Sequence, residues 1–359
     1  MNEQTKARGT PLPLISVLLP VRNEASFIER SVSSVLAQDY PAELMEIIVI
    51  DGKSDDGTRE ILAGLIAKHQ NLRMIDNPGR IVATGLNRGV AESAGEIVVR
   101  VDGHCEVAPD YVRRCVAHLQ QGADGVGGPL RTIGASPRAT IIAAAMSSQF
   151  GVGDSAFRTL SDQSMITDTV PFPAYTREIL ERAGPFDEEL VRNQDDEYNY
   201  RLRKLGARIF LAADVRSRYY SRSSFRSLWS QYFQYGYWKV RVLQKHPLQM
   251  RPRQFAPPLF VASLVGSGCA APFSLAGRVI FLAMVGAYGV ANLIAVRSVL
   301  RRQPAMPQLW LLPVAFAALH TSYGAGFLTG LVSFWNRWGA TEIRSGNPAG
   351  RPGGEMHWS

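Results

Sequence analysis

Cysteine is scarce in this chain: Cys105, Cys115 and Cys269 are the only cysteines among 359 residues, and they lie far apart. Disulfide-rich secreted domains and zinc modules need several cysteines at short spacing, so both classes are excluded. One region is also depleted of charge. Residues 254–336 contain no lysine, aspartate or glutamate, and only four arginines. A soluble surface carries charge of both signs, so this absence excludes a wholly soluble globule.

This region contains three long apolar stretches without charged residues, at 255–276, 279–296 and 309–335. Each approaches or reaches the roughly 20 residues that cross a bilayer core. One such stretch alone could be the core helix of a soluble protein. Three in succession predict a membrane region over 254–336 with two to three transmembrane helices. Prolines interrupt the first stretch, so a re-entrant segment is the alternative there.

Charge and length together predict the orientation of the chain. Arg297 and two further arginines follow the second apolar stretch, which favours a cytoplasmic position for that loop. The polar segment 1–13 and the short apolar run 14–21 contain nothing long enough to span a bilayer. We therefore expect a cytoplasmic amino-terminal domain, and a flexible tail at 337–359.

Residues 14–223 alternate between short apolar runs and helical patterns. Buried strands on both faces of a sheet read as uninterrupted apolar runs, as in Ile47–Ile50. The alternation predicts an α/β domain with a mostly parallel sheet that helices cover on both sides. The expected strands are 15–20, 46–51, 73–76 and 96–101, and the expected helices are 25–37, 57–69 and 81–94.

Polar residues gather where the expected strands end, and ligands of open α/β sheets bind at that edge. Arg22 and Glu24 follow the first strand, Asp51 ends the second, and Asp102 and His104 follow the strand at 96–101. Acids and an imidazole suit a diphosphate held with Mg²⁺ or Mn²⁺. Neither GxGxxG nor a P-loop sequence occurs at these turns, so neither kind of nucleotide site is supported. Each acid taken singly could instead be a turn or capping residue.

Three segments, LISVLLPVRNE, EIIVIDGKSDDGT and GEIVVRVDGHCEVAPDYV, carry a family resemblance. In this order and spacing they closely resemble the family-2 inverting glycosyltransferases, whose catalytic domain has the Rossmann-like GT-A fold. The resemblance covers residues 14–245 and implies a nucleotide-diphosphate-sugar donor, usually UDP-linked. Asp102-Gly103-His104 stands in the place of the family's Asp-x-Asp motif, so Asp102 and His104 are the implied ligands of a divalent cation, Mg²⁺ or Mn²⁺. The implied nucleotide-sugar-binding residues are Pro20, Arg22, Glu24, Asp51, Ser54 and Asp102.

The segment from Asn193 to Arg203 resembles the family's Glu-Asp pair at the start of a helix that carries Arg-x-Arg. Counting back from Arg201 assigns the catalytic carboxylate to Asp195, with Asp196 as the competing candidate. Inverting transfer needs one base that deprotonates the acceptor hydroxyl, and a carboxylate can do this. The alternative is a helix start that is acidic because the helix dipole favours negative charge there.

Two further segments are expected to form the side of the site that binds the acceptor. Pro173 and Tyr175 belong to a PFPAY segment that looks like the family's acceptor pocket. Gln234 and Trp238 lie in a basic, aromatic helix expected over 224–253, at the place of the Gln-x-x-Arg-Trp motif of processive synthases, which this chain does not match. That helix is also typical of a membrane interface. Its positive charge abuts the apolar region, which favours lipid headgroups over nucleic acid as the partner.

The segments DGHCE, PFPAY and QYGYWK most resemble bacterial exopolysaccharide enzymes of the succinoglycan type. This resemblance implies a multi-pass hexosyltransferase of the bacterial inner membrane, with a cytoplasmic catalytic domain. It would move one sugar, glucose from UDP-glucose, to a lipid-linked polyprenyl glycan. A sugar transferase acting directly on polyprenyl phosphate is one alternative, and a non-catalytic scaffold or sugar-nucleotide sensor is another.

Overall fold

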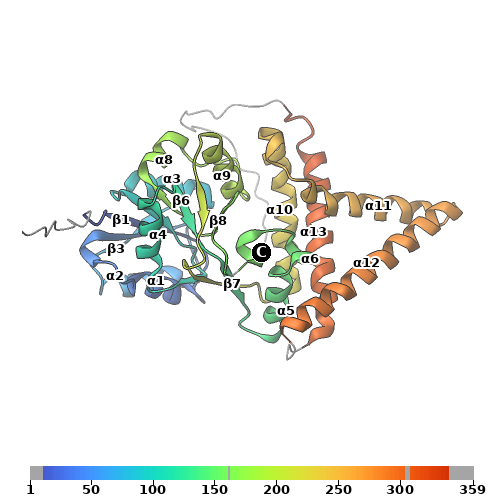
Figure 1. The fold of residues 1–359 in the computed structure, drawn as a ribbon, viewed down its shortest axis with the longest axis horizontal. Helices are drawn as coiled ribbons and strands as arrows, with labels where there is room; N and C mark the ends of the chain where they lie inside the picture. The colour runs from blue at the N-terminus through green and yellow to red at the C-terminus, as the bar shows by residue number, and fades with distance from the viewer. Residues whose placement is uncertain (1–10, 161, 304–307, 339–359) are drawn as a thin grey trace, which may run out of the picture.

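The computed structural model describes residues 11–160, 162–303 and 308–338, and contains two sheets (Figure 1). The strands of the main sheet, in spatial order, are β3 (Leu72–Asp76), β2 (Met45–Asp51), β1 (Ile15–Val21), β4 (Ile97–Arg100), β9 (Ala174–Thr176), β6 (Gly125–Gly127), β10 (Ile209–Leu211) and β8 (Met165–Ile166). The smaller sheet contains β5 (Cys105–Val107), β11 (Ser217–Tyr220) and β7 (Leu130–Ile133) in that order.

In the part of the chain that the structure describes, six helices belong to the α/β body, and three short ones follow β7 and pack on the main hydrophobic core of that body. The first group is α1 (Ile28–Leu36), α2 (Thr58–Ile66), α3 (Val82–Glu92), α4 (Tyr111–Gln120), α8 (Arg177–Ala183) and α9 (Gln194–Lys204). The short helices are α5 (Pro137–Met146), α6 (Gln149–Val152) and α7 (Ala156–Thr159), and 3-10 turns lie at η1 (Ala42–Leu44), η2 (Pro247–Gln249), η3 (Pro252–Phe255) and η4 (Leu309–Leu311).

The first half of the main sheet confirms the expected parallel arrangement. Strand β1 pairs in parallel with β2 and β4, and β2 pairs in parallel with β3. Successive residues of β1 point to opposite faces: Val17 packs with α1 and α4, whereas Leu18 packs with α3, α8 and α9, and both are fully buried. The sequence did not predict β9, a three-residue strand that lies antiparallel between β4 and β6.

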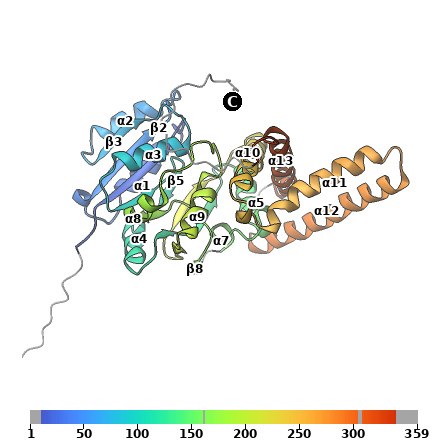
Figure 2. The same ribbon diagram turned by 90° about the horizontal axis from the view of Figure 1, so that it is seen from above.

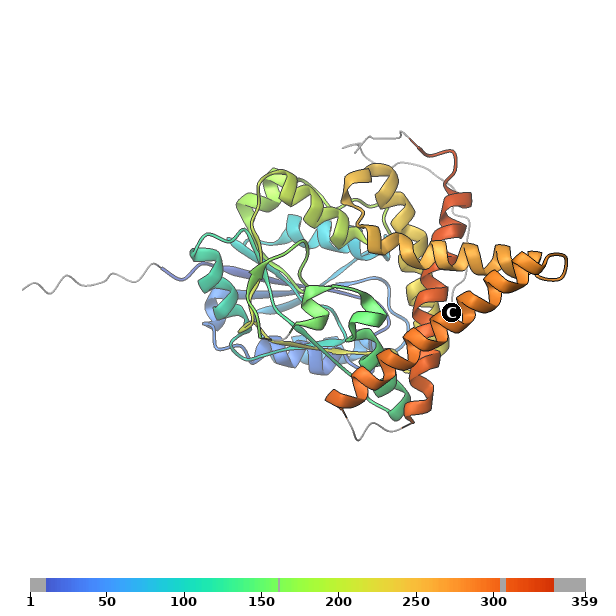
Figure 3. The ribbon, with the colours of Figure 1, turned by 45° about the vertical axis from the view of Figure 1, so that its right-hand side comes forward.

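In the carboxyl-terminal part, the first and last helices, α10 (Phe225–Lys245) and α13 (Leu312–Ser333), lie side by side (Figures 1 and 2). Glycines allow this close approach, because a Cβ on Gly326 would lie 2.0 Å from the Phe233 carbonyl oxygen. Between them in sequence, α11 (Ala256–Ala270) and α12 (Leu275–Arg302) form a hairpin that projects away from the rest of the molecule (Figure 3). In the described residues, two segments are long and apolar enough to cross a membrane, α12 and Leu309–Ser333.

Candidate active site

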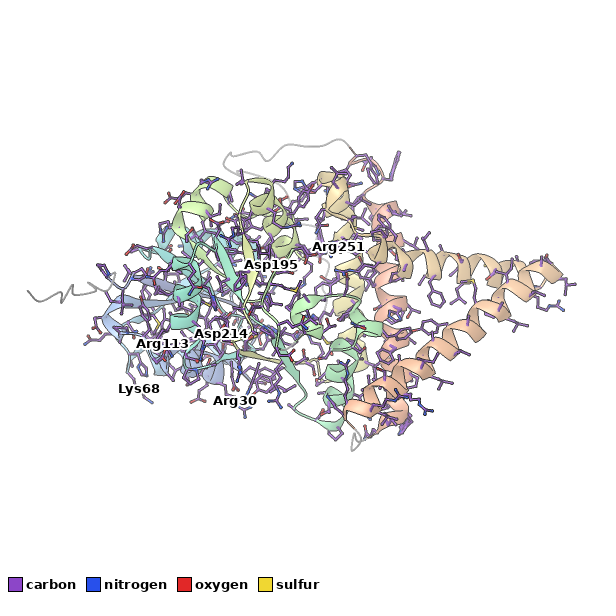
Figure 4. The ribbon with its side chains drawn as sticks, in the orientation of Figure 1. Arg30, Lys68, Arg113, Asp195, Asp214 and Arg251 are labelled. Atoms are coloured by element: carbon purple, nitrogen blue, oxygen red, sulfur yellow. The ribbon has the colours of Figure 1, made fainter. Side chains whose placement is uncertain are left out.

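A cavity of about 1410 Å³ lies beyond the carboxyl ends of β1 and β4, where ligands of such sheets bind. Strand ends and the start of α9 form one wall, which we call the donor wall. Residues of α10, η3, α11 and α13 form the opposite wall, which we call the helical wall. Figure 4 shows Asp195 on the side of the α/β body that faces the helices, and Arg251 near α10. The cavity therefore joins the sheet to the apolar part of the chain.

The first two strand ends play different parts in this wall. Pro20, Arg22 and Glu24 line the cavity. Asp51 is fully buried, and its carboxylate accepts hydrogen bonds from Arg59 Nη1 at 2.6 Å and from the Ser54 backbone N–H. The Ser54 hydroxyl accepts a hydrogen bond from the Asn23 N–H at 2.9 Å. Asp51 and Ser54 are not among the cavity-lining residues, and they tie the two strand-end loops together.

Asp102 and His104 both line the cavity, and each has a charged neighbour. Asp102 Oδ1 accepts a hydrogen bond from Arg100 Nε at 2.8 Å, and His104 Nδ1 lies 2.7 Å from Glu24 Oε1. Histidine ligands of metals commonly hold a carboxylate at the other ring nitrogen. The Glu24 contact fixes the ring through Nδ1, so a cation would meet His104 at Nε2. A carboxylate and an imidazole fit Mn²⁺ or Mg²⁺.

Among the described residues, no group of three or more His, Cys, Asp or Glu side chains could hold a metal ion. Two protein ligands leave most positions of a six-coordinate cation open, and diphosphate oxygens are the ligands that such cations prefer. The residues present therefore fit a cation that is held jointly by Asp102, His104 and a bound diphosphate.

Arg100 links the strand end to Asp195. Its side chain, at the end of β4, forms ion pairs with both Asp102 and Asp195, although 95 residues separate Arg100 from Asp195. Asp195 lies in the first turn of α9 and lines the cavity. Desolvation raises the pKa of Asp195 above its usual value, against the opposing effect of Arg100, and the nearby Asp102 and Asp196 charges add to the rise. A carboxylate with a raised pKa is a stronger base, as proton abstraction requires.

Asp196 is held differently. Its carboxylate accepts a hydrogen bond from Lys239 Nζ at 2.7 Å, and the Lys239 side chain is only 2% exposed. Lys239 belongs to α10, so this ion pair fastens the start of α9 to the helical wall. Asn193, which precedes α9, donates a second bond to the Tyr235 carbonyl of α10 at 2.8 Å. Sequence reasoning missed Arg100 and Lys239, because nothing local to either residue indicates its distant partner.

The four expected acceptor residues divide into two pairs. Pro173 and Gln234 line the cavity, whereas Tyr175 and Trp238 are not among its lining residues. Tyr175 is buried and donates a hydrogen bond to Asn199 Oδ1 at 2.7 Å. Trp238 packs against Phe334, with 5.6 Å between the ring centroids.

The cavity also contains buried polar atoms that lack a hydrogen-bond partner in the described part of the chain. They come from α7, the start of α9, α10, η2 and α13, and none was singled out from the sequence. A buried polar atom without a partner is unfavourable, so this set is suited to a polar ligand. The atoms include Arg158 Nη1, Gln194 Oε1, Gln231 Oε1, Gln249 Oε1 and Tyr323 Oη.

Comparison with known proteins agrees with this architecture. Residues 16–183 match the family described as "Glycosyl transferase family 2". The chain is 31% identical over 329 residues to "Succinoglycan biosynthesis protein ExoA" of Rhizobium meliloti, a match covering 89% of this chain and 96% of the relative. It is also 28% identical to "Dolichyl N-acetyl-alpha-D-glucosaminyl phosphate 3-beta-D-2,3-diacetamido-2,3-dideoxy-beta-D-glucuronosyltransferase" of Methanococcus voltae, over 64% of this chain and 74% of the relative.

Among solved structures, the chain resembles "Mannosyltransferase PcManGT from Pyrobaculum calidifontis in complex with GDP-Man and Mn2+", with a TM-score of 0.55 and 21% identity over 88% of each chain. This likeness concerns the fold, and it agrees with a GT-A-like α/β domain. The near-full-length match to a family member and the match to the family itself lead to one conclusion. The chain is a glycosyltransferase and belongs to glycosyltransferase family 2.

Proposed function

We propose that this protein is a membrane-anchored inverting hexosyltransferase that adds one sugar to a lipid-linked glycan in exopolysaccharide biosynthesis. The observation that carries the proposal is the single cavity in which the strand ends, Asp195 and the helical wall meet. A donor at the strand ends and a lipid-borne acceptor at the helical wall would reach the same carboxylate. The relative named for succinoglycan biosynthesis supports the place in exopolysaccharide biosynthesis, and UDP-glucose is our proposed donor.

The donor would lie across the first half of the sheet. Pro20 and Arg22 line the part of the cavity assigned to the nucleoside, and the buried Asp51 supports the loop beside it. Asp102 and His104 would hold the diphosphate through a divalent cation, which would neutralise the charge that develops on the leaving nucleoside diphosphate. Glu24 holds the His104 ring in place through its Nδ1 contact.

Asp195 is the proposed base. The acceptor hydroxyl oxygen forms a bond to the anomeric carbon while the bond from that carbon to the diphosphate oxygen breaks. The hydroxyl proton passes to Asp195, and the nucleoside diphosphate leaves. Arg100 orients this carboxylate and holds it near the diphosphate end of the site. Asp196, which is bonded to the buried Lys239, is a positioning residue for the start of α9.

The acceptor would enter from the helical wall, in contact with Pro173 and Gln234. Tyr175 and Trp238 do not line the cavity and would act on the acceptor only indirectly, through their neighbours. Lining residues from α11, α12 and α13 extend this wall into the apolar part of the chain. A lipid-linked substrate matches that combination of polar and apolar surface. The name of the relative from Methanococcus voltae describes transfer to a dolichyl-linked sugar phosphate, which agrees with an acceptor of this class.

The test uses membranes that contain the full-length protein and a panel of radiolabelled nucleotide sugars, followed by lipid extraction. We expect label from UDP-glucose in a glycosylated lipid diphosphate, and no label with Asp195→Asn membranes. Label on a lipid that carries one phosphate and no sugar besides the labelled one would indicate the polyprenyl-phosphate transferase instead. Release of UDP without transfer to any lipid would contradict the proposal and favour a non-catalytic sensor.

A further inference from the structure

Both ends of α13 contact the α/β body, although the helix is apolar enough to cross a membrane. At its start, Leu311 and Leu312 are buried in the main hydrophobic core, where η4 and α13 pack on α5. Just beyond its end, Arg337 forms an ion pair with Glu189 at 3.1 Å, and the Phe334 carbonyl accepts a hydrogen bond from Gln244 at 2.7 Å. A helix with both ends on the same domain cannot carry the chain across a bilayer.

The packing of α13 along its length leads to the same conclusion. It lies in backbone contact with α10, since a Cβ on Gly330 would come 2.6 Å from the Tyr237 carbonyl oxygen. Helix α10 carries cations that pair with the α/β body: the buried Lys239 with Asp196, the buried Arg241 with Glu189, and the half-buried Lys245 with Asp187. If α13 spanned a bilayer, α10 would bring these charges into hydrocarbon or lose its ion pairs. Charged side chains are rarely tolerated in the hydrocarbon core of a bilayer.

The α11–α12 hairpin has the opposite character. It projects from the molecule in every view (Figures 1, 2 and 3), and its apolar side chains are exposed, with Leu282 at 61% and Phe273 in the turn at 91%. Between Arg278 and Arg297, α12 contains no charged residue. Those 18 residues rise about 27 Å at about 1.5 Å each, close to the roughly 30 Å of a hydrocarbon core.

We infer that the α11–α12 hairpin is the membrane insert of this protein, and that α13 stays on the same side of the membrane as the catalytic domain. The partner of the exposed hairpin is a lipid bilayer with anionic headgroups, because the apolar length of α12 matches the bilayer and Arg297, Arg301 and Arg302 follow at its base. The inference rests on the membrane attachment proposed above. It departs from the sequence-based expectation that residues 309–335 form a further span.

The test is labelling of single cysteines with a membrane-impermeant maleimide in sealed, inverted bacterial membrane vesicles that contain the full chain. The background is Cys269→Ser, since Cys269 is exposed whereas Cys105 and Cys115 are buried. Trp310→Cys and Trp335→Cys probe the two ends of α13, where both side chains are well exposed. Phe273→Cys probes the hairpin turn.

Lys68→Cys, on the part of the α/β body far from the helices (Figure 4), reports the side that faces the reagent. We expect Trp310→Cys and Trp335→Cys to label as fully as Lys68→Cys, and Phe273→Cys to label only after detergent is added. Labelling of only one end of α13, or of neither end, would overturn the inference, and so would free labelling of Phe273→Cys. Sugar transfer is measured separately on the same vesicles, so lost activity with the expected labelling would contradict the proposed function alone.

Discussion

The two walls of the cavity are held in place by different interactions. The donor wall combines loops at strand ends with the start of α9. Hydrogen bonds join its neighbouring loops, as between Ser54 and Asn23, and the Arg100–Asp195 ion pair joins the loops to α9. The helical wall is attached to the body by ion pairs between distant residues, such as Arg241 with Glu189, and by glycine-mediated helix packing. Substitutions on the donor wall should therefore lower the rate of sugar transfer with little loss of stability. Substitutions on the helical wall should mainly lower the free energy of unfolding.

The largest effect should come from the donor wall. Asp102→Ala removes a proposed cation ligand, so donor turnover should fall below detection. Arg100 keeps its ion pair with Asp195, so the melting temperature should fall only modestly. His104→Asp should keep activity and shift the metal preference towards Mg²⁺, because carboxylate oxygens suit Mg²⁺ better than imidazole does. Both variants are assayed across a Mg²⁺ and Mn²⁺ series. Full wild-type activity in excess chelator would refute this assignment.

On the helical wall, Gly326→Ala should destabilise the attachment of α13 to α10. The new Cβ would lie 2.0 Å from the Phe233 carbonyl oxygen, so the helices must separate, at about 1–3 kcal/mol. The matched control is Gly64→Ala in α2, where nothing lies within 4 Å and alanine should stabilise the helix by up to about 1 kcal/mol. Thermal unfolding in detergent measures both, and equal shifts in the two variants would contradict the close packing.

Glu189→Gln should also lower the free energy of unfolding through the helical wall, by a smaller amount than Gly326→Ala. Glu189 contacts Arg241, Lys245 and Arg337, and it is about one-third exposed. Losing one partner of a buried pair costs about 3–5 kcal/mol, which solvent screening here reduces to about 1–2 kcal/mol. The control is Glu178→Gln, with an expected change of about 0–1 kcal/mol, because the Glu178 side chain is 81% exposed. A larger effect for Glu178→Gln would contradict this ranking.

Lowering the pH should produce the smallest effect, a loss of stability through protonation of Glu189. Hydrogen bonds and ion pairs with Arg241 and Lys245 outweigh partial burial and lower the pKa of Glu189 from 4.5 to about 2. Because the folded-state pKa is the lower one, the stabilisation is complete above the unfolded value and is lost as the pH falls from about 4.5 towards 2. The difference in melting temperature between wild type and Glu189→Gln should thus shrink from pH 7 to pH 3. A constant difference would show that Glu189 is not the responsible group.

Much of the donor wall could be predicted from the sequence, because strand periodicity fixes where β1, β2 and β4 end and therefore what lies at the sheet edge. Contacts between residues far apart in the sequence could not be predicted in this way. Arg100 meets Asp195 only because β9 enters antiparallel and brings the following segment back, and a three-residue strand is too short to show a period. Hydropathy also identified 309–335 as apolar without distinguishing contact with α10 from contact with lipid.

The most direct test of the account compares Asp195→Asn with Asp196→Asn in sugar transfer to extracted lipid, together with UDP-sugar affinity. A general base contributes about 10²–10⁴-fold, so Asp195→Asn should lose about that much transfer while nucleotide binding is kept. Asp196→Asn should be milder, because that carboxylate is bonded to Lys239 and serves the helix start. The wild-type rate should also rise with pH up to a value above the ordinary aspartate range, since burial raises the pKa of Asp195. An inactive Asp196→Asn beside an active Asp195→Asn would move the base by one residue, and two active variants would contradict the account.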